Sequence, residues 1–536
     1  MKKILILFIG ILLISCSKKD ESLKIALDSF TENDLEKHTK ILASDAFLGR
    51  KPFTEGETKT INYLKDEFTK IGLESFFQEV PLVQVTGKPS NKLTITKENK
   101  KLELALNDEF VAFSRVQKEI VGIDSSELIF AGYGIIAPEY NWNDYKDLDV
   151  KGKTVVVLVN DPGITTGDSN FFKGNTMTYY GRWTYKYEEA ARQGAKGCII
   201  VHNDKGAGYN FSVVRNGATF PKLYLQNNDG YKNRCEIEGW ITTSAAKRLF
   251  SFCGVDADLI KKAAIKNHKS LNLGVKATTS IHQSFVSKTS NNVLGYLEGS
   301  DKKDELIIFS AHWDCFGIGP KVDGDSIYNG AIDNGTSLAW MLETAEAFKK
   351  LNKKPSRSIL FFSPTAEEAG LLGSSYYVEN PVYPLAKTIA VINNDLMFPY
   401  GITKDVMVTG YGQSDLDDLL EIEAKKQNRY LLPDPNSHTG MFFRSDHFSF
   451  AKVGVPALFA RSYHDHLEKG KDWMRAKEKD YLSNKYHKTT DEVESDWDLS
   501  GVVLDSQLLF NLAYNLSNSN IYPQWKESSE FKNIKR

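Results

Sequence analysis

Two histidines and several carboxylates recur in five short motifs of the 536-residue chain. The motifs read SAHWD (Ser310–Asp314), GAIDNGTS (Gly330–Ser337), PTAEEAGLLGS (Pro364–Ser374), NNDLM (Asn393–Met397) and YHKTTDE (Tyr486–Glu492). Imidazole nitrogens and carboxylate oxygens are ligands of hydrolytic zinc sites, and these motifs hold enough donors for two ions. The pattern therefore predicts a centre with two Zn²⁺ ions.

The candidate ligands follow predicted strands or flank a predicted helix. His312 comes after LIIFSA, Glu367 and Glu368 come after ILFFSPTA, and Asp395 comes after IAVINN. Asp333 lies in a glycine-bounded loop before a helix. Taken singly, such a His is usually only a hydrogen-bonded polar residue, and paired Glu at a helix start often only interact with the helix dipole. Together, at strand ends where functional residues of open α/β sheets collect, they favour a metal site.

Strand and helix patterns alternate from Glu305 onward, which predicts an α/β fold with a mixed central sheet flanked by helices. Strands are expected at Leu306–His312, Ser358–Ser363, Thr388–Asn394, Val406–Gly410 and Ala457–Ala460, and helices at Thr336–Leu351, Leu371–Val378, Leu416–Gln427 and Gly501–Asn518. Earlier in the chain, helical spacing through Ile61, Leu64, Phe68 and Ile71 predicts a helix that Gly72 ends. Strands are expected at Phe76–Val85 and Leu93–Thr96.

The length favours two domains. Residues 119–284 change character, with strand-like runs such as KTVVVLVND and glycine- and asparagine-rich loops, and we interpret them as an inserted, mainly β, α+β domain. The catalytic domain is then expected in two parts, 29–118 and 285–525.

The N-terminus has the pattern of an export signal. Lys2 and Lys3 precede an apolar run that is too short to span a bilayer, and the run ends in Leu13-Ile14-Ser15-Cys16. This end resembles the lipobox of bacterial lipoproteins. Residues 1–16 are therefore expected to be a signal peptide, Cys16 a lipidated membrane anchor, 17–28 a polar tether, and the protein an exported lipoprotein of the cell envelope, facing the periplasm or the cell surface.

The composition argues against a nucleic-acid partner and leaves the state of the cysteines open. With 67 Lys and Arg against 69 Asp and Glu, nothing indicates a nucleic-acid-binding surface. The four later cysteines are too few for a disulfide framework, and the sequence leaves open whether Cys235 and Cys253 pair.

The five motifs together resemble those of the zinc aminopeptidases with co-catalytic metals, which are related to glutamate carboxypeptidases and glutaminyl cyclases. LASDAFLGRKPFTEGE (Leu42–Glu57) and SDHFSFAKVGVPAL (Ser445–Leu458) are similar to further family segments, although Phe53-Thr54-Glu55-Gly56 is a looser match. The resemblance implies the phosphorylase/hydrolase-like zinc peptidase fold. It also implies peptide substrates and hydrolysis by a water that two Zn²⁺ ions activate.

The family roles map onto individual residues. Asp333 matches the carboxylate that bridges both metals. The remaining metal ligands would be His312 and Asp395 at one ion, and Glu368 and His487 at the other. Glu367 matches the general base, and Asp314 the carboxylate that orients the ligand region. Tyr486 is proposed to stabilise the oxyanion, although simple packing beside the site is nearly as good an explanation.

Three other histidines are candidate site residues. His447 is expected to order the wall of the site rather than to bind metal. His464 and His466 form an alternative donor pair to His487, which is preferred because Thr-Thr-Asp-Glu follows it. The inserted stretch, with AGYGIIAPEYNWNDYKDLDVKGKTVVVLVNDP and KYEEAARQGAKGCIIVHN, resembles a protease-associated domain.

The leading interpretation is a membrane-anchored aminopeptidase. One alternative is a glutaminyl cyclase with a single zinc ion, and another is a receptor-like binding protein whose site is inactive. A carboxypeptidase that acts on acidic C-termini stays open, because the arginines that would bind such substrates cannot be identified from one sequence.

Overall fold

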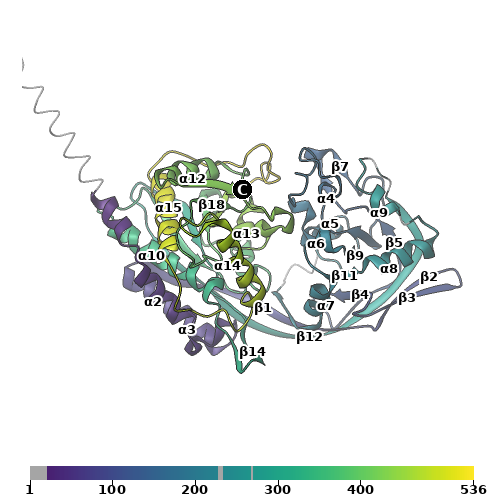
Figure 1. Cartoon of the computed structure of the whole chain (residues 1–536). Helices are drawn as coiled ribbons and strands as arrows, with labels where there is room; N and C mark the ends of the chain where they lie inside the picture. Colours follow the sequence, from purple (N-terminus) through teal and green to yellow (C-terminus); the bar gives the residue numbers. More distant parts are fainter. Residues whose placement is uncertain (1–20, 227–232, 257, 267, 269) are drawn as a thin grey trace, which may run out of the picture. The chain divides into compact units, whose positions relative to one another are not determined.

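The computed structural model describes residues 21–226, 233–256, 258–266, 268 and 270–536 (Figure 1). The chain forms two compact units. The first extends to Val80 and continues with Thr289–Asp434 and Arg444–Arg536, and the second comprises Pro81–Lys288 and Pro435–Phe443. The predicted signal peptide, Cys16 and the start of the tether lie outside the described residues.

The first unit is built on a mixed sheet, which confirms the predicted fold class. Its strand order is β19-β18-β20-β17-β13-β16-β12. The central strands β20, β17, β13 and β16 are parallel to one another, whereas β12 is antiparallel to β16 and β18 is antiparallel to β20. The bounds are β12 Leu271–Leu297, β13 Lys302–Ser310, β16 Arg357–Ser363, β17 Thr388–Asn393, β18 Asp405–Val408, β19 Tyr430–Pro433 and β20 Ala457–Ser462.

Helices cover both faces of this sheet. On β16, Phe361 packs against Phe68 of α3 (Glu55–Ile71), with 5.9 Å between the ring centroids. The next residue, Phe362, contacts Tyr377 of α11 (Leu372–Glu379) at 4.8 Å. Since successive residues of a strand point to opposite faces, α3 and α11 lie on opposite sides. The central strands are accordingly buried throughout and read as continuous apolar runs.

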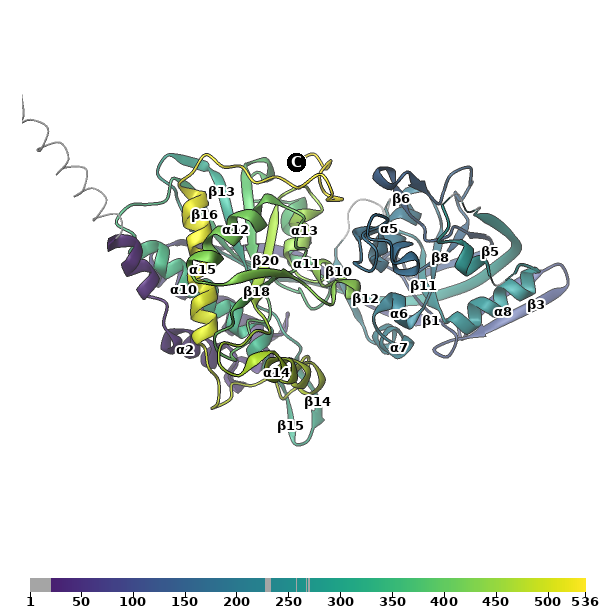
Figure 2. The same ribbon diagram turned by 45° about the horizontal axis from the view of Figure 1, so that its top comes forward.

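The helices on the α3 side form the main hydrophobic core (Figures 1 and 2). They are α2 (Glu32–Leu42), α3, α10 (Thr336–Lys350) and α15 (Ser500–Ser517), with α12 (Asp415–Lys426) packed against α15. On the other side α11 packs against α13 (His447–Ala451). Thr54 caps α3 by accepting the Gly56 N–H, and Gly72 ends it with a φ of 87°. Helices α3, α10, α11, α12 and α15 agree with the predicted ones to within a few residues, whereas α13 was not predicted.

Residues 21–28 differ from the predicted tether. They are helical, and Ala26 is buried in the core of the first unit with Leu23 and Leu27 packed beside it. Gln507 also donates to the Leu27 carbonyl at 3.1 Å. The overall polarity of the segment conceals an apolar stripe at helical spacing, and that stripe keeps it on the domain.

The second unit contains the parallel strands β5 (Ile120–Phe130), β8 (Thr154–Leu158), β9 (Gly197–Val201) and β11 (Ile237–Ile241). Antiparallel pairing adds β4 (Phe110–Phe113) beside β11, and β2 (Lys92–Lys97) with β3 (Lys100–Ala105). Other elements include β1 (Glu74–Pro89), β10 (Lys222–Leu225), α5 (Trp183–Arg192), α7 (Phe211–Thr219) and α8 (Thr243–Cys253). Two hydrophobic clusters fill this unit.

The boundary of the second unit differs from the predicted 119–284. The unit starts at Pro81 because β2, β3 and β4 pair within its sheet, and it includes Pro435–Phe443, where Ser437 accepts the Met177 N–H at 3.2 Å. Cys235 and Cys253 are both buried free thiols, so they do not pair.

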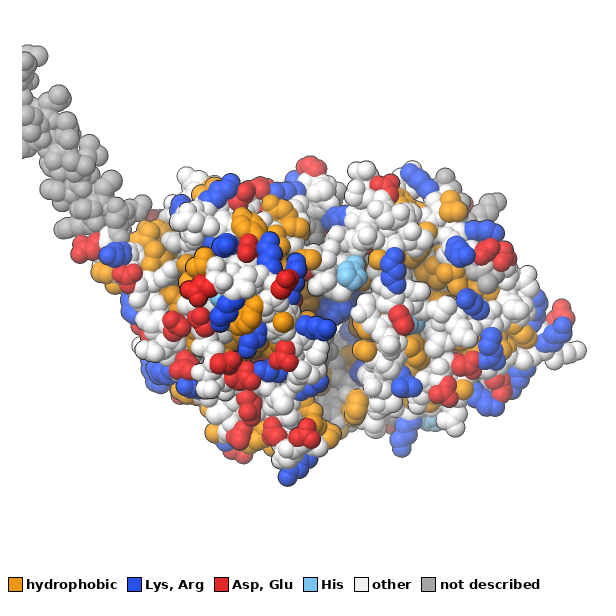
Figure 3. Space-filling model, viewed as in Figure 1, with side chains coloured by type: hydrophobic (Ala, Val, Ile, Leu, Met, Phe, Trp, Pro, Cys, Tyr) orange, Lys and Arg blue, Asp and Glu red, His pale blue; other side chains and the backbone are white. Residues whose placement is uncertain are grey.

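The surface carries charges of both signs, and the length and apolar character of the helices bear on membrane crossing. Acidic and basic side chains are interspersed over the face shown in Figure 3. Within the described ranges, no helix combines the length and the apolar character required to cross a bilayer.

Candidate metal centre

The carboxyl ends of three adjacent parallel strands position the predicted ligands. His312 follows β13 and Asp395 follows β17, while Glu367 and Glu368 come after β16. Asp333 lies in the short turn Ala331–Gly335, which leads into α10, and His487 follows α14 (Gly470–Asn484). Because β17, β13 and β16 are neighbours, their loops meet at one edge of the sheet.

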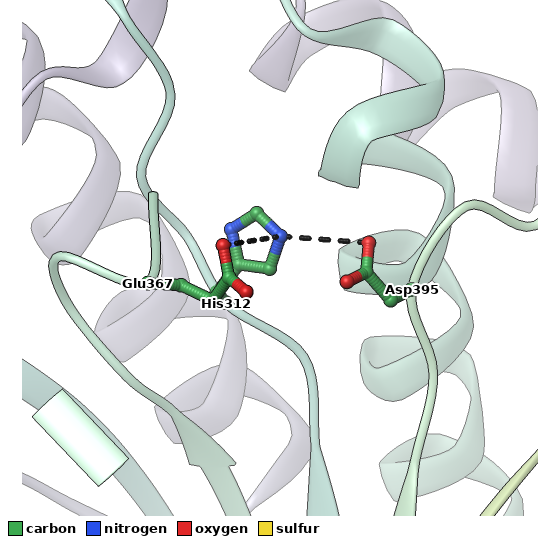
Figure 4. Close-up of side chains that lie close together, drawn as sticks. All are labelled: His312, Glu367 and Asp395. Carbon is green, nitrogen blue, oxygen red and sulfur yellow. Dashed lines mark ion pairs between the residues drawn. The ribbon is translucent and has the colours of Figure 1, made fainter. Parts of the chain in front are cut away.

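The ligands form two adjoining groups. In the first, His312 Nε2 lies 3.6 Å from Asp395 Oδ1 and 3.9 Å from Glu367 Oε2 (Figure 4). In the second, His487 Nε2 lies 3.4 Å from Glu368 Oε2. Asp333 joins the groups, because its Oδ1 is 3.3 Å from His312 Nε2 and its Oδ2 is 3.2 Å from His487 Nε2. One carboxylate thus presents an oxygen to each histidine, as a bridging ligand does.

The donor atoms are available for metal. Among the described residues, the buried atoms His312 Nε2, Glu368 Oε1 and Asp395 Oδ1 make no hydrogen bond of acceptable geometry. The other ring nitrogen of His312, Nδ1, lies 3.1 Å from the Asp314 carbonyl oxygen. An Nδ1–H donated to this carbonyl leaves the Nε2 lone pair for an ion. The residues therefore fit a pair of divalent cations.

Electrostatics also favour a cation here. Burial raises the pKa of Glu367 well above its usual range; His312 opposes this, and the Asp395 carboxylate raises it further. Burial likewise raises the pKa of Glu368, and Asp333 adds to the effect. Such crowded, buried carboxylates repel one another, and divalent ions relieve that repulsion.

Asp314 holds the backbone that carries both glutamates. Its Oδ1 accepts the Glu367 N–H at 2.9 Å and its Oδ2 accepts the Glu368 N–H at 3.3 Å. Burial raises the pKa of Asp314 to about 6. The structure thus gives Asp314 a positioning role through the backbone of both glutamates.

Asp491 was not predicted as a site residue. Its two carboxylate oxygens accept the N–H groups of Ile332 and Asp333, each at 3.1 Å, and Tyr481 Oη lies 3.3 Å from Oδ2. It therefore fixes the backbone of the bridging aspartate. The signal was present, since Asp491 belongs to the YHKTTDE motif.

Arg50 was also not predicted as a site residue. Its fully buried guanidinium donates to the carbonyls of Leu42, Trp313, Asn329 and Gly330 at 2.5–3.0 Å. Trp313 adjoins the ligand His312, and Gly330 opens the loop of Asp333. Arg50 thereby links two ligand segments to α2. It lies in Leu42–Glu57, the segment that resembles the opening segment of the peptidase family.

Tyr486 lies against His487, with 3.7 Å between the ring centroids. Burial raises its pKa well above the usual range, and the Asp333 carboxylate contributes. The structure places it beside the second ligand group, but its predicted role at the oxyanion stays a prediction.

The other histidines lie outside both ligand groups. His464 Nε2 is 2.6 Å from Glu478 Oε2, and His466 Nδ1 accepts the N–H groups of Glu468 and Lys469. His447 is buried on α13 with its ring 5.4 Å from that of Phe459. The structure therefore brings His312 and His487 close to the same carboxylate, Asp333, as the resemblance of the motifs implied.

The fold and the site define an α/β domain with two adjoining groups of metal-ligating side chains at its strand ends. Residues 292–510 match the family model described as Peptidase family M28, and residues 116–232 match that of the PA domain. Residues 292–510 thus match the M28 metallopeptidases, and a match to the PA domain precedes them in the sequence.

Curated relatives match parts of the chain. Aminopeptidase NAALADL1 of Mus musculus is 34% identical over 24% of this chain and 16% of its own length. Aminopeptidase YwaD of Bacillus subtilis (strain 168) is 34% identical over 46% of this chain and 40% of its own length. The chain thus spans less than half of either relative. Among solved structures, an aminopeptidase from Aneurinibacillus sp. strain AM-1 is 17% identical, with a TM-score of 0.48, over 95% of this chain and 97% of that one.

Proposed function

We propose that the chain is a zinc exopeptidase that removes N-terminal residues from peptides and uses two ions. The observation that carries the proposal is the position of Asp333, one of whose oxygens faces each histidine. The M28 match and the relatives named as aminopeptidases support the reaction and the end of the peptide at which it acts.

In this proposal, His312, Asp333 and Asp395 hold one Zn²⁺ ion, and Asp333, Glu368 and His487 hold the other. Bound ions of this kind lower the pKa of water and polarise the scissile carbonyl. The remaining chemistry belongs to the side chains.

Glu367 acts as the general base. Its carboxylate accepts a proton from the attacking water as the new C–O bond forms, and it returns the proton to the amine as the C–N bond breaks. Tyr486 donates its hydroxyl hydrogen to the oxygen on which negative charge develops.

The first test is the metal content of the purified protein after zinc titration, measured by elemental mass spectrometry. Two equivalents per chain are expected, and Asp333→Ala should lose one or both. One equivalent would instead favour the single-zinc cyclase, and none would favour an inactive binding protein.

The second test concerns the end of the peptide that is cleaved. A free tripeptide should lose its first residue, and acetylation of its N-terminus should stop the reaction while C-terminal amidation should not. The opposite pattern would identify a carboxypeptidase.

We also propose that the protein is an exported lipoprotein held in the cell envelope through Cys16. The support is the basic start, the apolar run and the Ser15-Cys16 end. Expressed in a bacterium fed with labelled palmitate, the protein should incorporate label, and Cys16→Ser should not. Label in both variants, or in neither, would refute the anchor.

A further inference from the structure

Four exposed lysines gather where α10 ends and the chain turns toward β16. They are Lys349, Lys350, Lys353 and Lys354. Cations in the last turn of a helix complement its dipole, which accounts for the first two, but the last two lie beyond the end of the helix. The sequence contains no acidic residue from position 347 to position 366. Residues 349–354 are called the lysine turn below.

The carboxylates near the lysine turn leave its charge available. Lys350 Nζ lies 2.6 Å from Glu346 Oε1. At the other end of the turn, Lys354 Nζ lies 3.7 Å from Glu298 Oε2. Exposed ion pairs of this kind contribute little to stability, so a phosphate group can compete for either lysine. The turn is therefore a positive surface on a chain whose formal net charge is −2.

The lysine turn adjoins the helix of residues 21–28, at the start of the described chain (Figure 1). The Asn352 N–H donates to Ser22 Oγ at 2.7 Å. Leu351, within the turn, packs on the same hydrophobic core as Leu23. Ile25 lies one turn after Ser22 on the helix and is 52% exposed. The helix and the lysine turn thus form one continuous part of the surface of the first unit.

Few residues separate this surface from the proposed lipid anchor. Residues 17–20 alone lie between Cys16 and the helix of residues 21–28. This stretch spans at most ~18 Å even when it is fully extended, because each residue adds no more than ~3.6 Å. An anionic membrane attracts lysines that lie within about a Debye length, ~10 Å, of its surface. An anchor at Cys16 therefore brings the lysine turn close to that range.

We propose that the lysine turn binds the anionic phospholipid head groups of the membrane that holds the anchor. Lysine ammonium groups bind phosphate as mobile point charges, so the contact needs no preformed pocket. A lipid anchor alone lets the domain rotate, whereas a second, electrostatic contact holds one face of the first unit on the bilayer. The inference rests on the proposed anchoring through Cys16 and is independent of the proposed peptidase activity.

The test measures sedimentation with vesicles of the chain from Ser17, which keeps every described residue but lacks Cys16. The chain should bind vesicles made of equal parts of phosphatidylglycerol and phosphatidylcholine, and it should not bind phosphatidylcholine alone. Changing the four lysines of the turn to Gln should lower the partition coefficient by about 100-fold, because each lysine near an anionic surface contributes about five-fold. Added salt should weaken the binding of the unchanged chain.

A matched control removes the same charge from the second unit, by changing the exposed residues Lys100, Lys101, Lys261 and Lys262 to Gln. This variant should bind as the unchanged chain does. An equal loss in both variants would show that net charge alone decides binding, and it would overturn the inference. Absence of binding to the anionic vesicles, or equal binding to both kinds of vesicle, would also overturn it. Binding to a short DNA duplex as strong as binding to the vesicles would reject a lipid-specific role.

A second measurement uses the mature lipoprotein in the same two kinds of vesicle. Acetylation of lysines, followed by mass spectrometry, should be slower at Lys353 and Lys354 in the anionic vesicles, and equal rates would contradict the proposed contact. Because the chain from Ser17 carries no lipid, its binding tests the lysine turn separately from the anchor. Binding of that chain, together with a failure of Cys16 to incorporate palmitate, would support the lipid contact and reject the anchor.

Discussion

The chemistry of the site depends on a single carboxylate, that of Asp333, which joins the two ligand groups. Asp333 serves both groups, and Asp491 and Arg50 hold the loop on which it lies. Asp314 holds Glu367 and Glu368 by their backbone N–H groups, so a single aspartate sets the position of a proposed base and a proposed ligand. Removing a ligand and removing the base should therefore have separable effects.

Glu367→Gln should lower kcat by roughly 10²- to 10⁴-fold while the zinc content stays at the wild-type value. The amide keeps the size of the side chain but cannot take a proton. Steady-state kinetics and elemental analysis of the same preparation check this. Glu346→Gln, at a half-exposed position on α10, is the control. Loss of metal from the Glu367 variant would make that residue a ligand.

The ligand groups could be predicted from the sequence because the five motifs that contain them resemble those of a known family. It could not identify residues that act through backbone contacts. Asp491 and Arg50 lie in segments that resemble the family. Their hydrogen-bond partners, however, are main-chain N–H and C=O groups, and the sequence carries no signal for contacts of this kind.

At the scale of elements, hydrophobic periodicity located the central strands of the first unit and helices α3, α10, α11, α12 and α15, but it did not locate β19, α13 or α14. It failed for residues 21–28, where the polar residues outnumber the few apolar residues that face the core. It also failed for the start of the second unit, because β2 and β4 pair with strands that are distant in the sequence. Local patterns report burial of one face, but they do not report which strand lies next to which.

Arg50→Met should destabilise the first unit by on the order of 3–5 kcal/mol, because four buried carbonyl groups lose their donor. Denaturant unfolding of the zinc-free protein measures it. Lys51→Met, at the exposed neighbouring position, should change stability little. A loss below about 1 kcal/mol would contradict the proposed link between α2 and the ligand loops.

Helix α12 contains a buried acid that makes stability depend on pH. Burial raises the pKa of Asp417 from 3.8 to about 6, and its carboxylate accepts the Gly412 N–H at 2.7 Å. Between these values the folded state binds more protons than the unfolded state, so stability falls as pH rises from about 4 to 6.

Asp417→Asn should remove this fall, which amounts to about 3 kcal/mol. The amide oxygen can still accept the Gly412 N–H. Urea unfolding at a series of pH values, with the exposed Asp418→Asn as control, measures the difference. Parallel pH profiles for wild type and Asp417→Asn would show that the shift is absent.

At the scale of the whole molecule, the two units have separate hydrophobic cores, and every proposed metal ligand belongs to the first. A ligand that binds only the folded state stabilises the part that holds it. Chelation should therefore lower the midpoint of one calorimetric transition and leave a second one unchanged. A common shift of both transitions would show that the units unfold together.

The chain order of the first unit sets the timing of its assembly during synthesis. Helices α2 and α3 are complete at Ile71, but α10, on which both pack, begins only at Thr336, after the second unit. At ~5–20 residues per second, the ribosome adds the intervening residues in tens of seconds. Throughout that interval Leu35, Leu64 and Phe68 lack the core partners that α10 supplies, so the N-terminal helices cannot complete their packing before Thr336 and the residues after it are made.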